Sequence, residues 1–242
     1  MNQNTIKFLT WNMDYWRRNP AQHETAWEYL KGINPDIAML QESNPEGQLF
    51  DGHNVYFHPV FKNWGSTIIA RSKYAIKKTS FLTNHAGSPS LMYYDVLLPD
   101  SSVVITVINV YGKHDAYGFC STTMHHIISD ITPLVVSNRN RLIILAGDFN
   151  VTEQWDFTHN DPAHKLVFDR LNDLGLINCT KDFFGDYVQT HIDERNPQNT
   201  YQLDYIYMSP LLYDKIIACR IHSKMSIGEA SDHLPIEVQV LV

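Results

Sequence analysis

The sequence has few cysteines, and none of them is spaced for a metal or redox motif. Its 242 residues include Cys120, Cys179 and Cys219 and no C-x-x-C pair. We therefore expect neither a zinc ribbon nor a disulfide framework. The three thiols are expected to be small core residues in a reducing compartment.

Basic residues are also in the minority. Lys and Arg number 19 against 26 Asp and Glu, which leaves a formal net charge of −7 at pH 7. This balance argues against a broad basic surface for duplex DNA or anionic membranes. A phosphate substrate stays compatible with it, because bound divalent cations would offset part of the acidic excess locally.

Long hydrophobic runs and linker-like segments are absent as well. No apolar stretch reaches membrane-spanning length, and residues 1–10 lack the apolar region of a signal peptide. We expect no membrane insertion, a cytoplasmic location and a monomer. Since no low-complexity tract or internal repeat divides the chain, and 44% of its residues are hydrophobic, residues 1–242 are predicted to form a single domain.

What the sequence does contain is mainly strand patterns. They cover residues 6–11, 36–40, 54–59, 66–70, 76–82, 91–98, 103–110, 142–146, 205–208, 216–222 and 234–242. Helical patterns cover residues 21–33, 121–136 and 162–174. Pro133 is expected to bend the second helix, and in the third Asp161 serves as N-cap and Gly175 as stop signal. This predicts an α+β fold in which two sheets pack together with helices outside them.

Five short motifs place polar side chains at the ends of these strands. They are Trp11-Asn12, Gln41-Glu42, Gly147-Asp148-Phe149-Asn150, Leu203-Asp204-Tyr205 and Ser231-Asp232-His233. The third is the most informative, because the apolar run 142–146 leads directly into it. A rigid strand end of this kind can aim its polar groups at a ligand.

The residue types in these motifs suit metal-assisted phosphate chemistry. Mg²⁺ prefers oxygen ligands and keeps several waters, so Glu42 and the amide oxygen of Asn12 would make a sparse, open cation site. A histidine oriented by a carboxylate can contact a phosphate oxygen in its charged form. Any one motif alone is more often a turn, a cap or a solvated edge. The joint occurrence of all five carries the interpretation.

These motifs, in this order, resemble the endonuclease/exonuclease/phosphatase superfamily. The resemblance spans nearly the whole chain. It implies a four-layer αββα sandwich of the DNase I type, with two mainly antiparallel sheets flanked by helices. It also implies divalent-metal-dependent cleavage of phosphoester bonds, with Mg²⁺ or Mn²⁺ as cofactor.

The resemblance also implies roles for individual residues. Asn12 and Glu42 match the metal-binding pair, and Asp232 matches a second acidic ligand position. Asp148 and Asn150 match the pair that activates water and orients the phosphate. His233 matches the phosphate-contacting histidine, with Asp204 as its orienting carboxylate.

In motif style the chain is closest to the exonuclease III and AP-endonuclease branch. Asn109-Val110-Tyr111 resembles the strand in which a tyrosine contacts the scissile phosphate. Residues 65–71 resemble the Gly-x-x-Ile-Leu-Ser-Lys strand of the whole family, with Ala70 in place of the usual Ser. Two segments depart from the branch. Lys113-His114 replaces a Pro-Asn pair, and Tyr201-Gln202-Leu203 lacks the arginine of the aromatic-Arg-Leu segment that lines the abasic-site pocket.

Further residues near the motifs are candidates for substrate binding. Trp16-Arg17-Arg18 could form a stacking and phosphate-binding lip, with an ordinary exposed loop as the alternative. The other candidates for the cleft wall are His114, His159, His191, Trp155 and Tyr201. A packed loop is the alternative for Trp155 and its neighbours.

The sequence thus predicts a metal-dependent phosphodiesterase, in first place a nuclease that hydrolyses DNA or RNA by in-line water attack. We expect single-stranded or short nucleic acids to be preferred. One alternative is a phosphatase or phosphodiesterase that acts on a small-molecule or lipid phosphoester. An alternative of another class is a catalytically inactive binding module that uses the same cleft.

Overall fold

The structure, a computed structural model, describes residues 5–48, 50–79, 90–99, 102–159 and 162–242. Within this part of the chain there are two six-stranded sheets, one small two-stranded sheet and seven helices. The helices are α1 (Pro20–Ile33), α2 (Cys120–Ser137), α3 (Glu153–His159), α4 (Lys165–Asp173), α5 (Cys179–Phe184), α6 (Pro210–Tyr213) and α7 (Lys224–Ile227).

The first six-stranded sheet is built mainly from the two ends of the chain. Its strand order is β13 (Ile216–Ile221), β14 (Ile236–Leu241), β1 (Thr5–Asn12), β2 (Ile37–Ser43), β4 (Trp64–Arg71), β3 (His53–Phe61). Strands β1 and β2 are parallel, and the other neighbours are antiparallel. A helical crossover, α1, joins the parallel pair, as parallel strands require.

The second sheet repeats this plan with the middle of the chain. Its order is β5 (Ala75–Lys78), β6 (Leu91–Leu97), β7 (Val104–Tyr111), β8 (Leu142–Asp148), β12 (Asp204–Met208), β9 (Ile177–Asn178). Only β7 and β8 are parallel among its paired strands, and α2 connects them. The small sheet pairs β10 (His191–Ile192) with β11 (Thr200–Tyr201).

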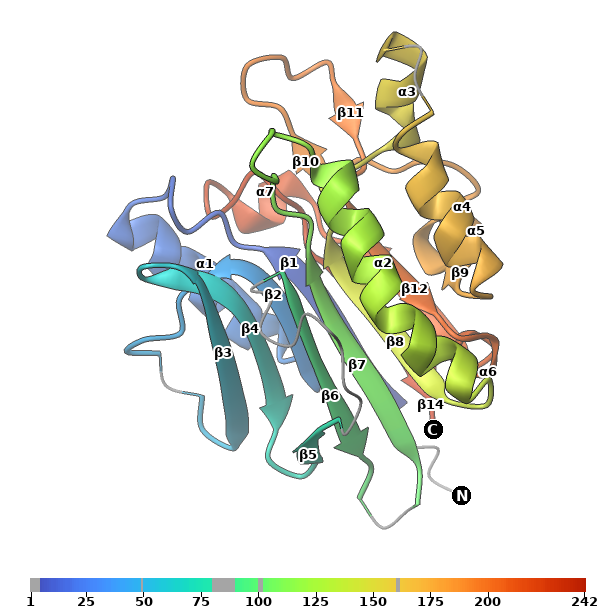
Figure 1. Cartoon of the computed structure of the whole chain (residues 1–242). Helices are drawn as coiled ribbons and strands as arrows, with labels where there is room; N and C mark the ends of the chain where they lie inside the picture. The colour runs from blue at the N-terminus through green and yellow to red at the C-terminus, as the bar shows by residue number, and fades with distance from the viewer. Residues whose placement is uncertain (1–4, 49, 80–89, 100–101, 160–161) are drawn as a thin grey trace.

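The two large sheets pack face to face, and helices cover their outer faces (Figure 1). Buried side chains such as Phe8, Met39, Ile144 and Ile206 fill the space between the sheets. Outside the second sheet, α2 and α4 bury their apolar faces on β8 and β12. Outside the first sheet, Trp27 and Leu30 of α1 cover β1 and β2. The four-layer αββα sandwich expected from the sequence is confirmed.

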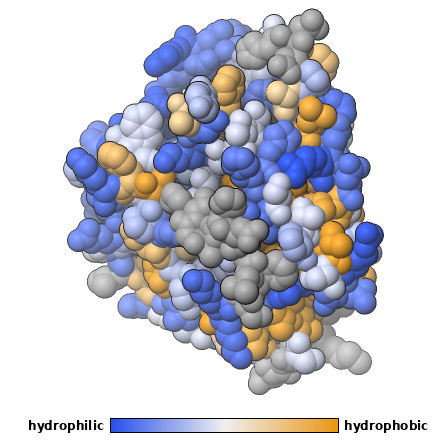
Figure 2. Space-filling view, viewed as in Figure 1, coloured by the Kyte–Doolittle hydropathy of each residue, from blue (hydrophilic) through white to orange (hydrophobic). Residues whose placement is uncertain are grey.

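Among the described residues, no helix is both long and apolar enough to cross a bilayer. On the face shown in Figure 2, hydrophobic atoms form small separated patches among hydrophilic ones.

Most predicted elements lie within a few residues of the observed ones, but the third helix begins later than expected. It starts at Lys165 rather than at Pro162, while Asp161 and residues 80–82 of a predicted strand lie outside the described residues. The Asp156 carboxylate fixes the start by accepting hydrogen bonds from the backbone nitrogens of His164 (3.1 Å) and Lys165 (2.6 Å). Asp156 itself lies in α3, a helix that the sequence reading missed.

The second helix runs through its proline. Pro133 lies inside α2, which continues to Ser137. Six other elements have no clear sequence signal: α5, α6, α7, β9, β10 and β11. Each is too short to show a hydrophobic period.

Candidate active site

The strand ends that carry the motifs meet at one end of the sandwich. In the parallel pairs, Asn12 lies opposite Gln41 and Tyr111 lies opposite Asp148. The antiparallel partner β12 begins at Asp204, which also lies opposite Asp148. In Figure 1 this is the upper end of the sheets, away from the two chain termini. The register therefore brings side chains from both sheets to a common edge.

Asp148 is held by hydrogen bonds from two asparagines. Its Oδ2 accepts from Asn12 Nδ2 at 2.9 Å and from Asn150 Nδ2 at 2.7 Å. Its Oδ1 accepts from the backbone nitrogen of Asn150 at 2.9 Å, and Asn150 adopts a left-handed conformation with φ of 51°. The Asp148 side chain is fully buried, and this burial raises its pKa to about 8, with the Asp204 carboxylate adding to the rise and His233 opposing it.

A glycine allows Asp148 to lie this close to β7. Gly147 has φ of 151°, and a Cβ there would lie 1.9 Å from the backbone oxygen of Val110. Any side chain would push β7 and β8 apart at the point where Tyr111 pairs with Asp148. The Gly-Asp dipeptide of the motif is thus a packing requirement of the site.

Glu42 lies at a break in the regular pairing of its strand. The register between β2 and β4 shifts between Leu40 and Ser43, and Glu42 has φ of 44°. Its Oε1 accepts a hydrogen bond of 2.8 Å from the hydroxyl of Tyr111. Burial raises the pKa of Glu42, while the Tyr111 hydrogen bond and the charge of His233 oppose the rise. Burial and the Glu42 charge also raise the pKa of Tyr111, so its hydroxyl remains a donor.

Asp14 belongs to the site, although the sequence reading did not include it. It is 2% exposed and lines the same cleft as Glu42 and Asp232. Burial and the nearby Asp232 raise its pKa to about 7. The available signal was its position two residues after Asn12, at the end of a buried strand.

The Asn12 amide is oriented by both aspartates. Its Oδ1 accepts from the backbone nitrogen of Asp14 at 2.9 Å, and its nitrogen faces Asp148. In this geometry Asn12 donates to the Asp148 carboxylate, while its Oδ1 is already an acceptor for the Asp14 backbone. Its role as a metal ligand therefore stays a prediction.

His233 and Asp204 form a buried pair. Nδ1 of His233 lies 2.8 Å from Asp204 Oδ2, which leaves Nε2 as the nitrogen free for the cleft. The backbone of His233 is fixed as well: its oxygen accepts a hydrogen bond from Trp11 Nε1 at 2.9 Å, and its backbone nitrogen donates one to Ser231 Oγ at 2.9 Å. Burial alone would lower the pKa of His233, but the Asp204 and Asp148 carboxylates hold it well above its usual range.

Asp232 is paired with cations rather than exposed to solvent. Its Oδ2 accepts a hydrogen bond from Arg17 Nη1 at 2.5 Å and lies 3.7 Å from His191 Nε2. Burial opposes ionisation, yet the hydrogen bond with His191 and the charges of His233 and Arg17 keep the pKa of Asp232 well below its usual range.

The two predicted lip arginines are engaged in ion pairs. Arg18 Nη2 lies 2.7 Å from Asp14 Oδ2 and 3.0 Å from Glu194 Oε1, and the Arg18 side chain is buried. Arg17 donates to Glu194 Oε2 at 3.0 Å in addition to Asp232. Arg17 lines the cleft, whereas Arg18 is not among its described lining residues.

The site residues surround an open cleft of about 370 Å³. Its described lining consists of Asn12, Asp14, Trp16, Arg17, Glu42, Trp64, Tyr111, Lys113, His114, Asp148, Asn150, His191, Asp232 and His233. His114 and His191 thus lie where the sequence suggested.

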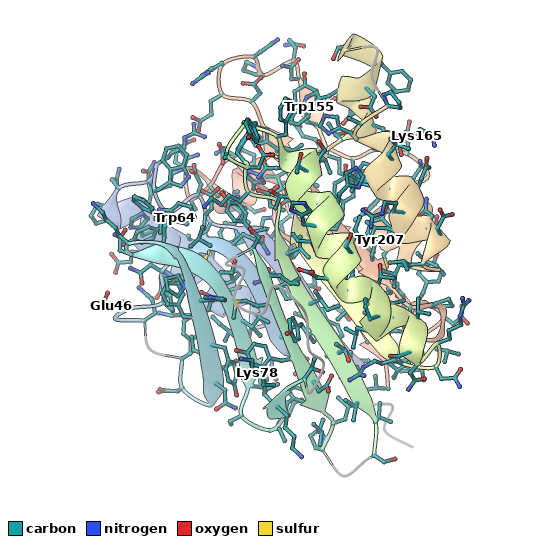
Figure 3. The ribbon with its side chains drawn as sticks, viewed as in Figure 1. Glu46, Trp64, Lys78, Trp155, Lys165 and Tyr207 are labelled. Carbon is teal, nitrogen blue, oxygen red and sulfur yellow. The ribbon has the colours of Figure 1, made fainter. Side chains whose placement is uncertain are left out.

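Trp155 and Tyr201 are not in this described lining. Their rings pack edge to face on each other at 5.4 Å. Figure 3 shows Trp155 on α3, well apart from Trp64. The Trp155 ring packs against Tyr201 and His164 instead of the cleft.

The donor set fits a hard divalent cation. Carboxylates of Asp14, Glu42, Asp148 and Asp232 gather at the cleft, and burial and mutual repulsion raise the pKa of the first three. A divalent cation would relieve this repulsion, and oxygen ligands are the ones that Mg²⁺ and Mn²⁺ prefer. The arrangement can therefore bind a cation and a phosphoryl group side by side.

Solved structures with the same fold include enzymes that act on DNA. An AP endonuclease from Leishmania major has a TM-score of 0.77 over 98% of this chain and 88% of its own, at 17% identity. An AP endonuclease from Archaeoglobus fulgidus gives 0.73 over 96% and 98%, at 19% identity. The 3′ phosphatase NExo from Neisseria, bound to a product DNA hairpin, gives 0.73 over 97% and 99%, at 18% identity. Such identities establish the likeness of the fold alone.

Family membership follows from the sequence match. No curated protein matches the chain. The pattern of the Endonuclease/Exonuclease/phosphatase family matches residues 9–233, a range that includes all five motifs. The matched range covers more than nine-tenths of the chain, and the shared fold agrees with it. The chain therefore belongs to the endonuclease/exonuclease/phosphatase family.

Proposed function

We propose that this protein is a divalent-metal-dependent phosphodiesterase that hydrolyses nucleic-acid phosphodiester bonds by in-line attack of water. The observation that carries the proposal is the environment of Asp148. Its carboxylate is buried at the cleft and oriented by hydrogen bonds from Asn12 and Asn150, and burial raises its pKa. A carboxylate held in this way is placed to accept a proton from water as a general base.

Asp148 orients and deprotonates the attacking water. The two amide donors fix the direction of its carboxylate, and a raised pKa strengthens it as a proton acceptor. Asn150, which lines the cleft, steers the phosphate.

Glu42, Asp14 and Asp232 are the residues that would hold Mg²⁺ or Mn²⁺. When bound, such a cation supplies positive charge that polarises a phosphoryl oxygen. Asn12 links this group to the base through its hydrogen bond with Asp148.

His233 and Tyr111 stabilise the charge that develops on the phosphoryl oxygens. His233 is kept protonated by the Asp204 and Asp148 carboxylates, so its Nε2 donates to an oxygen from the cleft wall. Tyr111 is neutral, and its hydroxyl, which donates to Glu42 Oε1, can turn to donate to a phosphoryl oxygen instead.

The substrate we favour is single-stranded or short nucleic acid. Nucleic acid is supported by the DNA enzymes that share the fold. The preference for short or single strands rests on the net charge of −7 and on ion pairs that occupy Arg17 and Arg18, which leave few cations for a duplex. Trp16, 60% exposed at the cleft, offers a surface on which an unpaired base can stack.

A cleavage screen tests this proposal. Matched single-stranded and duplex DNA, RNA, an abasic duplex and a small phosphodiester are each incubated with Mg²⁺, Mn²⁺ or EDTA over a salt series. We expect cleavage of single strands that EDTA abolishes and that weakens only shallowly with salt. Incision of the abasic duplex alone would contradict the substrate preference, and turnover of the small phosphodiester alone would favour a small-molecule phosphoesterase.

A variant pair tests the mechanism in the same assay. Asp148→Asn removes the base and should lower turnover by roughly 10²–10⁴-fold. Asp173→Asn, at an exposed position of α4, should be as active as the unaltered protein. If both variants keep full activity, Asp148 is not the base.

A further inference from the structure

A rigid backbone pairing brings His191 next to the Ser-Asp-His motif. His191 and His233 form an antiparallel bridge, and two flanking hydrogen bonds strengthen it: Ile192 N to Asp232 O at 2.8 Å and Leu234 N to Thr190 O at 2.7 Å. The two imidazole rings have centroids 4.8 Å apart. The relative position of the histidines is thus set by main-chain contacts.

Asp232 lies between the two imidazoles. His191 Nε2 is 3.7 Å from Asp232 Oδ2, and His233 Nε2 is 4.0 Å from Asp232 Oδ1. One ligand atom from each of the three residues lies within 4.8 Å of the others, and all three residues line the cleft. In a tetrahedral zinc site with ligand bonds near 2.1 Å, neighbouring ligand atoms are about 3.4 Å apart, so the three ligand atoms would have to move together by at most about 1.4 Å.

From this geometry we infer that His191, Asp232 and His233 form a second cation site, which selects zinc or a similar borderline metal over magnesium. Imidazole nitrogens favour Zn²⁺, Ni²⁺ and Cu²⁺, whereas Mg²⁺ favours oxygen ligands and water. The site shares Asp232 with the proposed magnesium ligands, but its two imidazole nitrogens distinguish it from the carboxylates of Glu42 and Asp14.

The surroundings of His233 suit this role. Its Nδ1 is bound to Asp204 at 2.8 Å, so Nε2 is the nitrogen that would bind a metal, which must displace the Nε2 proton. A carboxylate behind a ligating imidazole is the common arrangement in zinc sites, where it fixes the ring and makes the nitrogen a better ligand.

The Arg17 guanidinium would compete with a metal ion for the Asp232 carboxylate. Its guanidinium contacts Asp232 Oδ2, the oxygen that faces His191. The Arg17 side chain is 38% exposed and can turn toward solvent, where Glu194 also binds it. A metal ion would replace the arginine charge at Asp232.

One consequence rests on the proposed phosphodiesterase function. A metal on His233 Nε2 would remove the donor that contacts the phosphate, so zinc should inhibit magnesium-dependent cleavage. The zinc site itself is tested by binding measurements, which do not depend on catalytic turnover.

The decisive experiment is calorimetric titration of the full chain with Zn²⁺ in excess Mg²⁺, which occupies Glu42 and Asp14 while zinc competes for Asp232. We expect one zinc per chain. His191→Ala removes a direct ligand and should weaken zinc binding at least roughly 10–100-fold. Loss of a residue that only hydrogen-bonds to a metal ligand already costs that much. His114→Ala, a cleft histidine outside the cluster, should bind zinc like the unaltered protein. Titration with Co²⁺ should give intense visible absorption bands that His191→Ala lacks.

Arg17→Ala supplies an independent test at an exposed side chain. By removing the competing cation, it should tighten zinc binding several-fold, and this holds even if His191→Ala proves unstable. Zinc binding that is unchanged in both variants, or absent in excess Mg²⁺, would overturn the site. Zinc binding as expected in a protein that cleaves no phosphoester would leave the site standing and overturn the proposed function instead.

Discussion

The side-chain nitrogen of Asn12 lies 2.9 Å from Asp148 Oδ2, although 136 positions separate the two residues. Asn12 ends the central strand of one sheet, and Asp148 ends a central strand of the other. Their hydrogen bond therefore joins the two sheets at the point where the cleft opens. Because Asp148 is fully buried, this bond also bears on its protonation.

Asn12→Ala should raise the pKa of Asp148 above its value of about 8. The Asn12 hydrogen bond stabilises the ionised carboxylate, so its removal favours the protonated form. A ¹³C NMR titration of the carboxyl groups in metal-free protein measures the shift. Asn140→Ala, in an exposed loop, is the control. An Asp148 pKa that stays the same or falls would show that the Asn12 hydrogen bond does not stabilise the ionised form of Asp148.

Asp204→Asn should lower the pKa of His233. The Asp204 carboxylate is the main group that raises this pKa against the effect of burial, and an amide carries no charge to do so. The imidazole signals in an NMR pH titration report the change directly, and turnover should fall with it near neutral pH. Asp214→Asn, outside the site, is the matched control. Unfolding of Asp204→Asn, seen by circular dichroism, would instead point to a structural role for the pair.

Magnesium binding should strengthen as the pH rises through 7. A carboxyl group gives up its proton before it ligates a cation, and the pKa of Asp14 is raised to about 7 while that of Glu42 is also raised. Calorimetry in two buffers of different ionisation enthalpy should therefore show proton release on binding. Affinity that is the same at pH 6 and pH 8 would contradict this linkage.

Glu42→Gln should weaken magnesium binding by about tenfold or more, because it removes a charged oxygen ligand. Glu46→Gln, an exposed position of the following loop, should leave the affinity unchanged. The same calorimetric titration measures both variants. Equal affinities would place the cation elsewhere in the cleft.

Glu237→Gln should destabilise the protein at pH 7 but not at pH 2. His222 and Gln239 lower the pKa of Glu237 from 4.5 to about 2 against the effect of burial. A depressed pKa stabilises the fold above pH 4.5, and this contribution is lost as the pH falls toward 2. After allowance for solvent screening we expect a loss on the order of 1 kcal/mol at pH 7, measured by urea unfolding. Glu229→Gln, at an exposed position, should have no such effect.

Local patterns were sufficient to predict the long elements and the architecture. The apolar run 142–146 and the helical spacing of residues 21–33 each match an observed strand or helix closely. Elements of four to six residues, such as α6 and α7, were missed because less than two turns cannot show a period. The start of α4 was misplaced because its cap, Asp156, comes from the preceding helix rather than from the adjacent residues.

The candidate site also has features that the sequence predicts and features that only the tertiary structure determines. Five motifs at strand ends predict Glu42, Asp148, Asp204 and His233 as site residues, because residue type and position after a buried strand are properties of the chain itself. Ion pairs between distant loops cannot be read from the sequence in this way. Only the tertiary structure shows that Arg17 contacts Asp232 and that Arg18 is buried between Asp14 and Glu194. Likewise, the pairing of β10 with the Ser-Asp-His segment sets His191 beside His233. Such contacts depend on how two sheets and their loops pack in space, and a linear pattern carries no record of those distances.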